Sequence, residues 1–557
     1  MSGALHLTPA DARRAASLLL LREAPAGFEV LMLRRAERDG DMRSGACVFP
    51  GGVLDAGDRD AQRWCLGGDD AALSRRFGLA EGGLDYAVAA VRETFEEVGL
   101  LLAATPDGRP VDVAAHAAVL PGWRERLQRG EASIAAMCQA LDLRLDLRGL
   151  AYTSHWLTPP GLPKRFDTRF FMVAAPAGQV AQADLGEALE LMWLTPQQAL
   201  EPQRDLKLLP VTRRTLQDLA KFGSAKAAWQ DADARREVPL TMPRRASSRK
   251  GPRIVLPDEL PYAEVARLDP DGRGDVSAEL VPGVPVRLSP RLLRITAPNP
   301  GMMTGPGTNS YFVGDPDADR WALVDPGPTD AAHLQALQQH APGPVVMVLA
   351  THTHVDHSPG AVAAAQAFGA PVLGRRPRFL QGQDATFAPE RELSDGEHLV
   401  LGPGTTLHVF HTPGHASNHL CYLVEQERTL LTGDHVMQGS TVVINPPDGD
   451  MSAYLKALAA LLDVDLQWLA PGHGFLVAEP HAVLRGLIQH RLRREAKVRS
   501  ALEALGEGAL EDLLPRVYDD VPPGLHPVAR RSLLAHLLKL QDDGVALEQG
   551  TRWRVRS

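Results

Sequence analysis

The chain has 557 residues, more than one hydrophobic core usually organises, so its length predicts two or more domains. With 44% hydrophobic and 23% charged residues, the composition is that of a folded globular protein and excludes disordered and collagen-like classes. A formal net charge of −9 argues against a protein that coats nucleic acid with a basic surface, so any contact with RNA or DNA would have to be local.

Cysteine usage and the first apolar run favour a cytoplasmic protein with no membrane association. The cysteines are widely separated and form no C-x-x-C pair: they are Cys47, Cys65, Cys138 and Cys421. This spacing suggests neither a disulfide framework nor a thiolate zinc site, which fits a reducing compartment. The run Leu18–Leu21 ends at Arg22, far short of a membrane span or a signal-peptide core, and is predicted to be a buried strand.

The pattern of apolar and turn-forming residues divides the chain into four regions. Residues 5–222 mix short apolar runs with one clear helix. Residues 223–285 are poor in periodicity and rich in Pro, Arg and Ser, which predicts a linker whose basic stretch 243–253 is solvated. Residues 286–480 alternate strand-like and helix-like runs, as in a layered α/β domain, and residues 481–557 are mostly helical before a terminal hairpin. The strand-like runs are Val345–Ala350, His408–His411 and Leu420–Val424, and the helix-like ones are Ala361–Phe368 and Tyr454–Leu462.

A helix rich in carboxylates is predicted over residues 84–100, with Gly99 placed to end it. Its buried stripe is formed by apolar residues three to four positions apart: Val88, Val91, Phe95 and Val98. Glu93, Glu96 and Glu97 then share another face, where they repel one another unless cations lie among them. Such an oxygen-rich cluster suits Mg²⁺ or Mn²⁺ bound together with a phosphate substrate, whereas the alternative is a solvated acidic face.

The residues around this helix resemble the box of the Nudix hydrolases, which runs Gly, five residues, Glu, seven residues, then Arg-Glu-x-x-Glu-Glu-x-Gly. The matching segments are FPGG (49–52) and RETFEEVGL (92–100). Two features depart from the box: Asp58 stands in place of Glu, and 33 residues instead of seven separate it from Arg92. An interrupted box of this kind is similar to the Nudix branch that hydrolyses the diphosphate of coenzyme A and acyl-CoA. The resemblance covers about residues 5–215.

This resemblance implies an α/β/α Nudix fold and a site that hydrolyses a diphosphate. Glu96 and Glu97 would ligate Mg²⁺ or Mn²⁺, and Glu93 would be the catalytic residue, as a further ligand or as the base. Water would then attack one phosphorus atom of the substrate. The basic residues that could hold the other phosphates, which the sequence does not rank, are Arg34, Arg35, Lys164 and Arg165.

A second constellation of candidate ligands lies in the region 286–480. The segment THTHVDHSPG (351–360) follows the apolar strand VVMVLA directly, which places three histidines and one aspartate in a loop at the end of a strand. Further His and Asp residues follow later strands, and such spacing favours a transition metal such as zinc over isolated core histidines. The whole set is Asp325, His352, His354, Asp356, His357, His415, Asp434 and His473.

This ordered set resembles the metallo-β-lactamase fold family and implies its αββα fold. The resemblance implies two Zn²⁺ or similar ions, which would hold a hydroxide as the nucleophile and so support hydrolysis of a thioester, an ester or a phosphodiester. One ion would be held by His352, His354 and His415, and the other by Asp356, His357 and His473. Asp434 would bridge the ions, Asp325 would fix the loop, and Asp356 would also be a catalytic residue. Three nearby histidines are given less weight as ligands: His411, His419 and His435.

The start of this region and the tail look like the branch that contains β-lactamase-like protein 2, which carries a C-terminal winged-helix domain and is associated with cleavage of single-stranded RNA. The tail helix is basic and could engage phosphates, or it could dock on acidic neighbours. Its cationic residues are Arg485, Arg491, Arg493, Arg494, Lys497 and Arg499. The fold also hosts thioesterases, so fold alone does not identify the substrate.

Together these resemblances predict a bifunctional metal-dependent hydrolase of three domains: Nudix (5–222), metallo-β-lactamase fold (286–480) and winged helix (481–557). The expected partners are a small-molecule diphosphate or acyl-CoA, with single-stranded RNA left open. The alternative function is a C-terminal hydrolase or RNA nuclease in which the Nudix part binds a nucleotide without turnover.

Overall fold

The structure, a computed structural model, describes residues 8–36, 44–183 and 188–556. Positions 5–7 and 557, at the ends of the predicted domains, lie outside the described residues. The chain divides into two compact units. The first comprises Met1–Arg245, Arg253–Pro257 and Asp271–Gly274, and the second comprises Ala246–Pro252, Asp258–Pro270 and Asp275–Ser557. Among the described residues, every helix is too short or too polar to cross a lipid bilayer.

The first unit is built on one sheet with the strand order β10-β2-β1-β9-β8-β11, to which β3 and β4 are added beside β2 and β1. The strands are β1 (Ala12–Ala24), β2 (Gly27–Arg35), β3 (Cys47–Val48), β4 (Gly51–Val53), β8 (Ala151–Leu157), β9 (Arg165–Ala174), β10 (Ala188–Leu194) and β11 (Leu240–Thr241). The apolar run Leu18–Leu21 lies inside β1 as predicted, and β1 pairs in parallel with β9.

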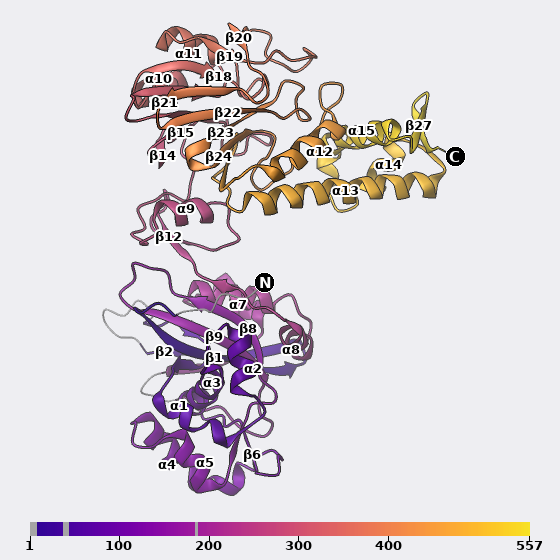
Figure 1. The fold of residues 1–557 in the computed structure, drawn as a ribbon. Coiled ribbons are helices and arrows are strands. Elements are labelled where there is room, and N and C mark those ends of the chain that lie inside the picture. Colours follow the sequence, from indigo (N-terminus) through magenta and orange to yellow (C-terminus); the bar gives the residue numbers. More distant parts are fainter. Residues whose placement is uncertain (1–7, 37–43, 184–187, 557) are drawn as a thin grey trace. The chain divides into compact units, whose positions relative to one another are not determined.

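Alternation along β1 explains why helices cover both faces of this sheet. Leu18 and Leu20 pack in one core cluster with the buried stripe of α3, whereas Leu19 and Leu21 pack with α7 and α8 on the other face. The helices are α1 (Ala56–Asp60), α2 (Asp70–Phe77), α3 (Gly83–Val98), α4 (Leu120–Gln128), α5 (Ile134–Leu141), α6 (Pro196–Leu200), α7 (Pro210–Leu219) and α8 (Ala225–Ala234). A small sheet adds β5 (Cys65–Leu66), β6 (Ala103–Ala104) and β7 (Arg144–Asp146). The result is the predicted α/β/α arrangement (Figure 1).

The segment 223–285 contains regular elements, which differs from the predicted linker. Helix α8 begins after Ser224, whose side chain accepts a hydrogen bond from the Ala227 amide, and it buries alanines in the first unit. Helix α9 (Tyr262–Leu268) belongs to the second unit. The short strands are β12 (Arg244–Ala246) and β13 (Arg253–Val255). The periodicity was weak because alanines, not large apolar residues, form the buried face of α8.

The second unit contains two sheets. The first has the order β14 (Pro285–Ser289), β15 (Leu292–Thr296), β16 (Asn309–Asp315), β17 (Arg320–Val324), β18 (Val345–Leu349), β19 (Val372–Gly374) and β20 (Arg391–Glu392). The second has the order β21 (His398–Gly402), β22 (Thr405–His411), β23 (Leu420–Val424), β24 (Thr429–Gly433) and β25 (Trp468–Pro471). The predicted strand-like runs are therefore confirmed.

Three apolar clusters show that these sheets form the central layers of an αββα sandwich. Tyr311 and Val313 of β16 pack between the sheets, whereas Phe312 points to the opposite face and packs with α10 and α11. The outer face of the second sheet packs with α12 and the start of α13. The helices are α10 (Ala331–His340), α11 (Ala361–Phe368), α12 (Met451–Ala460) and α13 (Pro480–Leu505), visible on the two outer sides in Figure 1.

The last residues form a small helical domain with a three-stranded sheet of order β26-β28-β27, and Trp553 lies at its core. Its further elements are α14 (Leu510–Val517), α15 (His526–Asp542), β26 (Glu507–Ala509), β27 (Ala546–Gln549) and β28 (Arg552–Val555). Helix α13 is shared, because Leu484 packs under the second sheet and Val498 packs in this domain. Short 3-10 turns occur at η1 (Gln62–Trp64), η2 (Ala114–His116), η3 (Pro202–Arg204), η4 (Glu425–Glu427), η5 (Leu461–Asp463) and η6 (Pro523–Leu525).

Candidate metal centres

In the first unit, the candidate carboxylates lie near the end of α3 and are organised by Arg92. Its Nη1 donates to Glu93 Oε1 at 2.8 Å and to Glu96 Oε1 at 3.3 Å. On its other side Arg92 donates to both carboxylate oxygens of Asp58, at 2.7 and 3.0 Å. The cation therefore offsets the repulsion between neighbouring carboxylates that the sequence predicts.

Asp58 meets Arg92 despite the long interruption of the box. Asp58 is fully buried, and it also accepts a hydrogen bond from the Asp55 amide at 2.7 Å, which caps α1. The 33 residues between the two partners include the end of α1, η1, β5, α2 and the start of α3, so that the interruption folds as an insertion with regular elements of its own. Asp58 thus acts as the buried partner that orients Arg92.

The glycine-rich loop before α1 runs directly against the glutamates. The Gly51 amide donates to Glu97 Oε2 at 2.8 Å. A Cβ on Gly52 would stand 2.4 Å from the carboxyl carbon of Glu93, so a side chain at this position would displace that carboxylate. Burial raises the pKa of Glu93 to about 7, although Arg92 opposes the shift. The loop therefore holds Glu93 and Glu97 in a confined, partly desolvated position.

The three glutamates do not converge on one point. Among the described residues, the groups of three or more potential ligands whose atoms all lie within 4.8 Å of one another are in the second unit. Carboxylate oxygens suit Mg²⁺ or Mn²⁺, which usually complete their coordination with water and substrate phosphates, so the donor chemistry of Glu93, Glu96 and Glu97 fits such an ion. Of the basic candidates, Arg165 is buried and donates to Asp11 and to the Thr158 carbonyl, which is a structural role.

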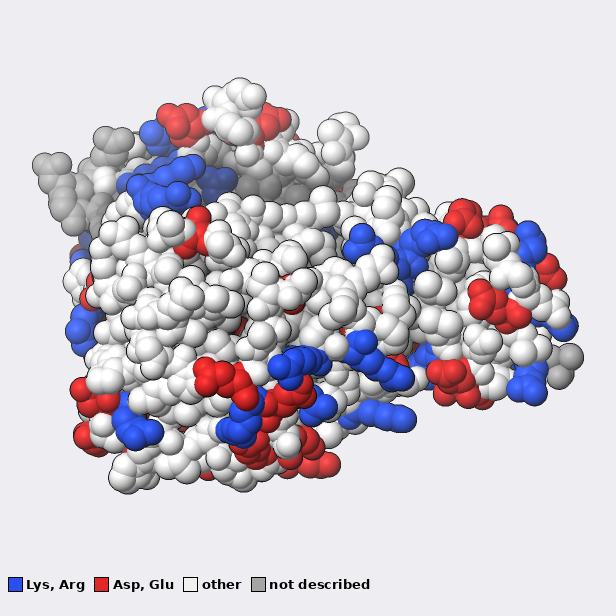
Figure 2. Space-filling view, turned by 90° about the horizontal axis from the view of Figure 1, so that it is seen from above, with Lys and Arg blue, Asp and Glu red and all other residues white. Residues whose placement is uncertain are grey.

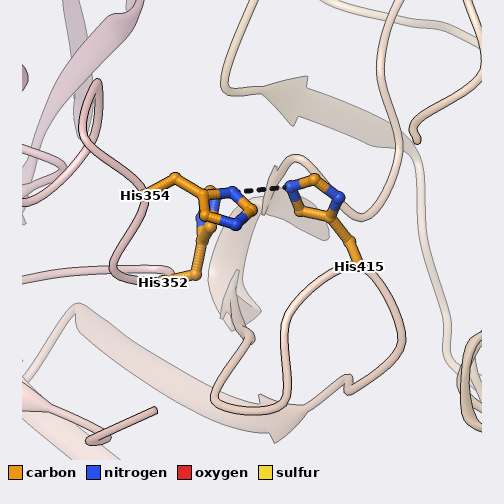
Figure 3. Close-up of side chains that lie close together, drawn as sticks. All are labelled: His352, His354 and His415. Atoms are coloured by element: carbon orange, nitrogen blue, oxygen red, sulfur yellow. Dashed lines mark hydrogen bonds between the residues drawn. The ribbon is translucent and has the colours of Figure 1, made fainter. Parts of the chain in front are cut away.

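In the second unit, the predicted ligands come together from loops at one end of the sheets. His352 and His354 follow β18, His415 follows β22, Asp434 follows β24 and His473 follows β25. Three imidazoles form the first group: His354 Nδ1 lies 2.9 Å from His352 Nε2 and 2.9 Å from His415 Nε2 (Figure 3). Three ring nitrogens that face one another suit a single cation placed between them.

The second group joins two imidazoles to two carboxylates. Asp356 Oδ2 lies 3.3 Å from His357 Nε2 and 3.2 Å from His473 Nε2. Asp434 Oδ1 lies 3.4 and 3.3 Å from the same two nitrogens. Its other oxygen, Oδ2, lies 3.7 Å from His415 Nε2 in the first group. Asp434 therefore faces both groups, as a ligand shared by two ions would.

The opposite nitrogen of several rings is held by a partner that turns Nε2 inward. His415 Nδ1 lies 2.8 Å from the Val443 carbonyl, and His473 Nδ1 lies 3.1 Å from the Gly307 carbonyl. His357 Nδ1 lies 2.9 Å from Asp325 Oδ2. Each partner accepts a hydrogen bond and so fixes the tautomer with a free Nε2 lone pair. Asp325 thus supports a candidate ligand and is not one itself.

Two observations show that the residues of this centre fit bound cations. His357 Nε2, His473 Nε2 and Asp434 Oδ1 are buried without a hydrogen-bond partner, which is costly unless an ion lies among them. A Cβ on Gly472 would stand 2.7 Å from Asp434 Oδ1 and 2.7 Å from the ring of His357, so the glycine keeps that space open. The donor set of imidazole nitrogens and carboxylate oxygens suits transition metals.

The two groups differ in electrostatics. Burial, reinforced by the neighbouring imidazole of His415, lowers the pKa of His354 to about 3, so the first group presents neutral rings. For His473, burial also acts to lower the pKa, but Asp434 and Asp356 outweigh it and raise the pKa to about 9. The second group therefore attracts positive charge, which protons or metal ions can supply.

The three histidines given less weight lie outside the ligand groups, but one supports them. His419 is buried, its ring stacks on His352 with centroids 5.0 Å apart, and its Nε2 accepts a hydrogen bond from the Asp434 amide at 3.2 Å. His411 lies 3.0 Å from the Ser417 carbonyl, and His435 packs against Tyr454. His419 therefore positions two candidate ligands.

Sequence reasoning missed two polar residues of the loop before β16 that support the centre. Thr308 Oγ1 donates to Asp356 Oδ2 at 3.2 Å. Asn299 donates to Thr308 Oγ1 at 3.0 Å and accepts from the Thr308 amide at 2.9 Å. The available signal was their position in the segment APNPGMMTGPGTNSYFVGD (297–315), at the start of the region that resembles the branch of β-lactamase-like protein 2.

Most of the cationic side chains of α13 have hydrogen-bond or ion-pair partners within the chain. Arg491 is buried and donates to the Val442 carbonyl, Arg494 donates to the Val517 carbonyl and to Asp520, and Lys497 pairs with Asp519. In Figure 2 the lobe at the right, which holds the end of α13, carries Lys and Arg intermixed with Asp and Glu. These contacts are typical of a helix that packs against neighbouring parts of its own unit.

Comparison with known proteins gives the same division. Residues 303–473 match the Metallo-beta-lactamase superfamily, residues 80–211 match the NUDT19 Nudix domain, and residues 509–553 match the Beta-lactamase associated winged helix domain. The chain is 31% identical over 278 residues to the "Beta-lactamase-like protein 2 homolog" of Drosophila melanogaster, covering 48% of this chain and 92% of the relative. The chain belongs to the metallo-β-lactamase superfamily.

Two further similarities complete the comparison. An "Atrochrysone carboxyl ACP thioesterase" of Aspergillus chevalieri is 32% identical over 288 residues, covering 48% of this chain and 88% of the relative. Among solved structures, a NUDIX hydrolase from Alicyclobacillus acidocaldarius is 27% identical, with a TM-score of 0.34, covering 40% of this chain and 97% of that one. The family matches over residues 80–211, 303–473 and 509–553 confirm the predicted multidomain fold and the prediction of a metal-dependent hydrolase.

Proposed function

We propose that the chain is a bifunctional hydrolase. Its metallo-β-lactamase centre hydrolyses a thioester of an apolar acyl group, and its Nudix site hydrolyses a diphosphate linkage in CoA, acyl-CoA or a nucleotide derivative. On this proposal both sites take parts of acyl-CoA molecules as substrates. The expected cofactors are two Zn²⁺ or similar ions in the second unit and Mg²⁺ or Mn²⁺ in the first.

The observation that carries the thioesterase proposal is a set of exposed apolar side chains on the loops that hold the candidate ligands or contact them. Val355 stands between the candidate ligands His354 and Asp356 in the sequence, and it is 63% exposed. Met302 is 78% exposed, in the loop whose Thr308 donates to Asp356. Leu380 is 72% exposed, and its carbonyl accepts from the Gln383 amide beside His354. Large apolar groups left in water near a reactive centre support binding of an acyl chain.

The chemistry assigned to the chain's own residues follows from their positions. Bound divalent cations would supply a water of lowered pKa at this centre. The neutral rings of His352, His354 and His415 would hold one ion, and Asp356, His357 and His473 the other. Asp434 would bind both, and Asp325, His419 and Thr308 would keep these side chains oriented. The thioester carbonyl would lie over the centre with its acyl chain against the apolar side chains.

The diphosphatase proposal rests on the arrangement around α3. Glu96 and Glu97 are the proposed metal ligands, and Glu93 is the proposed catalytic residue. The Gly51 amide and Arg92 keep these carboxylates next to the glycine-rich loop, where a hard cation bound with substrate phosphates would find oxygen donors. A module that binds nucleotide without turnover is the alternative for this unit.

Cleavage of single-stranded RNA is the alternative for the second unit. The resemblance of this region and the tail to a branch associated with cleavage of single-stranded RNA favours this alternative, but the paired cations of α13 leave it with less support than the thioester. RNA binding depends on unpaired cations that release counterions from phosphates.

One panel on the full chain tests both proposals. Wild type, His354→Ala and Glu97→Gln would be assayed with acyl-CoAs of increasing chain length, CoA and single-stranded RNA. We expect thiol release to rise with acyl length and to fall about a thousandfold in His354→Ala, and diphosphate cleavage to fall about a hundredfold in Glu97→Gln. RNA cleavage without thioester cleavage would overturn the first proposal, and CoA binding without turnover would overturn the second.

A further inference from the structure

A second cluster of imidazole and carboxylate groups lies on the surface of the second sheet, away from the ligands described above. His398 of β21 and His408 of β22 face each other as a cross-strand pair, and their rings stack with centroids 4.4 Å apart (strands labelled in Figure 1). Glu425 of η4 lies beside them, with Oε1 3.1 Å from His398 Nε2 and 4.0 Å from His408 Nδ1. One donor atom from each residue lies within 4.8 Å of the others.

The surrounding backbone holds the three side chains in place while leaving them open to solvent. The ladder between β21 and β22 fixes the two histidines, and the Phe410 ring packs 4.2 Å from that of His408. The side chains of His398, His408 and Glu425 are 50%, 26% and 35% exposed, so that an ion can enter without unfolding. Ligands of one tetrahedral zinc lie about 3.3 Å apart, a spacing that small rotations of these side chains reach.

We propose that His398, His408 and Glu425 form a third transition-metal site, separate from the hydrolytic centre. Two imidazoles and one carboxylate suit Zn²⁺, Ni²⁺ or Cu²⁺ and leave at least one coordination position for water. An ordinary surface ion pair would explain the contact between His398 and Glu425, but it would not account for the second imidazole stacked beside the first.

Metal in this site would tie the edge strand β21 to η4. Strand β21 is the outer strand of its sheet and pairs only with β22 within the described sheet order. A bound ion would link its first residue to a turn that follows β23, and so would stabilise that corner against opening. The site supports structure or metal storage, because its residues lie on strands β21 and β22 and on η4, and not on the loops that hold the hydrolytic ligands.

The number of zinc ions that the full chain binds tests this proposal. Protein carrying metal in its hydrolytic centre would be desalted and titrated with ZnCl₂ by calorimetry. We expect one additional equivalent, bound at least about tenfold more weakly in His398→Ala and in Glu425→Gln. The matched control is His340→Ala, which removes an exposed histidine at the end of α10 and should leave this binding unchanged.

Hydrolytic activity separates this site from the proposed function, because neither variant touches the hydrolytic centre and both should retain wild-type turnover. Circular dichroism of each variant checks that the fold is intact. Wild-type protein that takes up no further zinc would overturn the proposal, as would variants that bind the additional equivalent with wild-type affinity.

Discussion

The two candidate centres are built in opposite ways. The glutamates of the first unit lie within five residues of one another on α3 and are gathered by a cation of the chain itself, Arg92. The ligands of the second unit come from positions 352 to 473, at the ends of several strands, and are oriented by carbonyl and carboxylate partners.

This difference matches the ions that each donor set prefers. A hard cation keeps water and binds substrate phosphates, so its protein site needs only a few carboxylates near the substrate. A transition metal held by imidazoles needs nitrogen lone pairs at fixed positions, which the fold prepares in advance. The first centre is therefore expected to be completed by substrate, whereas the second should bind its ions before substrate arrives.

The largest expected effect tests the preformed centre. His354→Ala removes the ring nitrogen that lies 2.9 Å from both other imidazoles. We expect loss of thioester hydrolysis by about a thousandfold and a fall in bound metal measured by elemental analysis. Diphosphate hydrolysis should remain at the wild-type rate, and His340→Ala should change neither activity. Equal loss of both activities would contradict the separation of the two centres.

The next prediction concerns the buried pair that organises the helical centre. Asp58→Ala leaves Arg92 buried without its main partner, because Asp58 accepts two hydrogen bonds from it. We expect the free energy of unfolding of the first unit to fall by about 3 kcal/mol, measured by denaturant titration. The control is Asp60→Ala, which changes an exposed residue of the same helix. A change of similar size in both variants would mean that the pair is not the cause.

A smaller effect is expected at the helical centre itself. Glu97→Gln keeps the shape of the side chain that accepts from the Gly51 amide but removes its charge. Diphosphate hydrolysis should fall by about a hundredfold, with thioester hydrolysis unchanged. Glu81→Gln, at an exposed position just before α3, is the control. Wild-type diphosphatase activity in Glu97→Gln would remove this residue from the proposed ligand set.

The smallest effect is expected from α13. Arg491 donates to the Val442 carbonyl, and the next residue, Val443, accepts from His415 Nδ1. Arg491→Met should loosen that loop and weaken metal binding by about tenfold, measured by competition with a chelator. Arg485→Met changes an exposed arginine of the same helix and should have no effect. Unchanged metal affinity in Arg491→Met would show that the loop is fixed without it.

Elements with strong periodicity were predictable from the sequence. The run in β1 and the helix over residues 84–100 appear in the structure within a few residues of their predicted bounds, because large apolar side chains repeat on one face. Helices α8 and α9 were not predicted. The buried residues of α8 are alanines, and in α9 the buried Glu264 pairs with Arg294, so large apolar side chains do not repeat along either helix.

Site residues divide in the same manner. The histidines and aspartates of the second unit stand in a dense pattern at strand ends, so the sequence named them, and the structure brings them together. The supporting roles of His419 and Thr308 depend on contacts between distant segments, which no local pattern reports. For the same reason the pairing of Asp58 with Arg92 across the insertion became visible only in the fold.

Helix α13 has a consequence for motion. It spans 26 residues without interruption, which corresponds to about 39 Å, with one end under the second sheet and the other in the core of the winged helix. Two domains joined by a flexible tether can tumble independently, but domains that share one rigid rod cannot. The terminal domain should therefore reorient in solution together with the hydrolytic domain, and nuclear spin relaxation should give both the same correlation time.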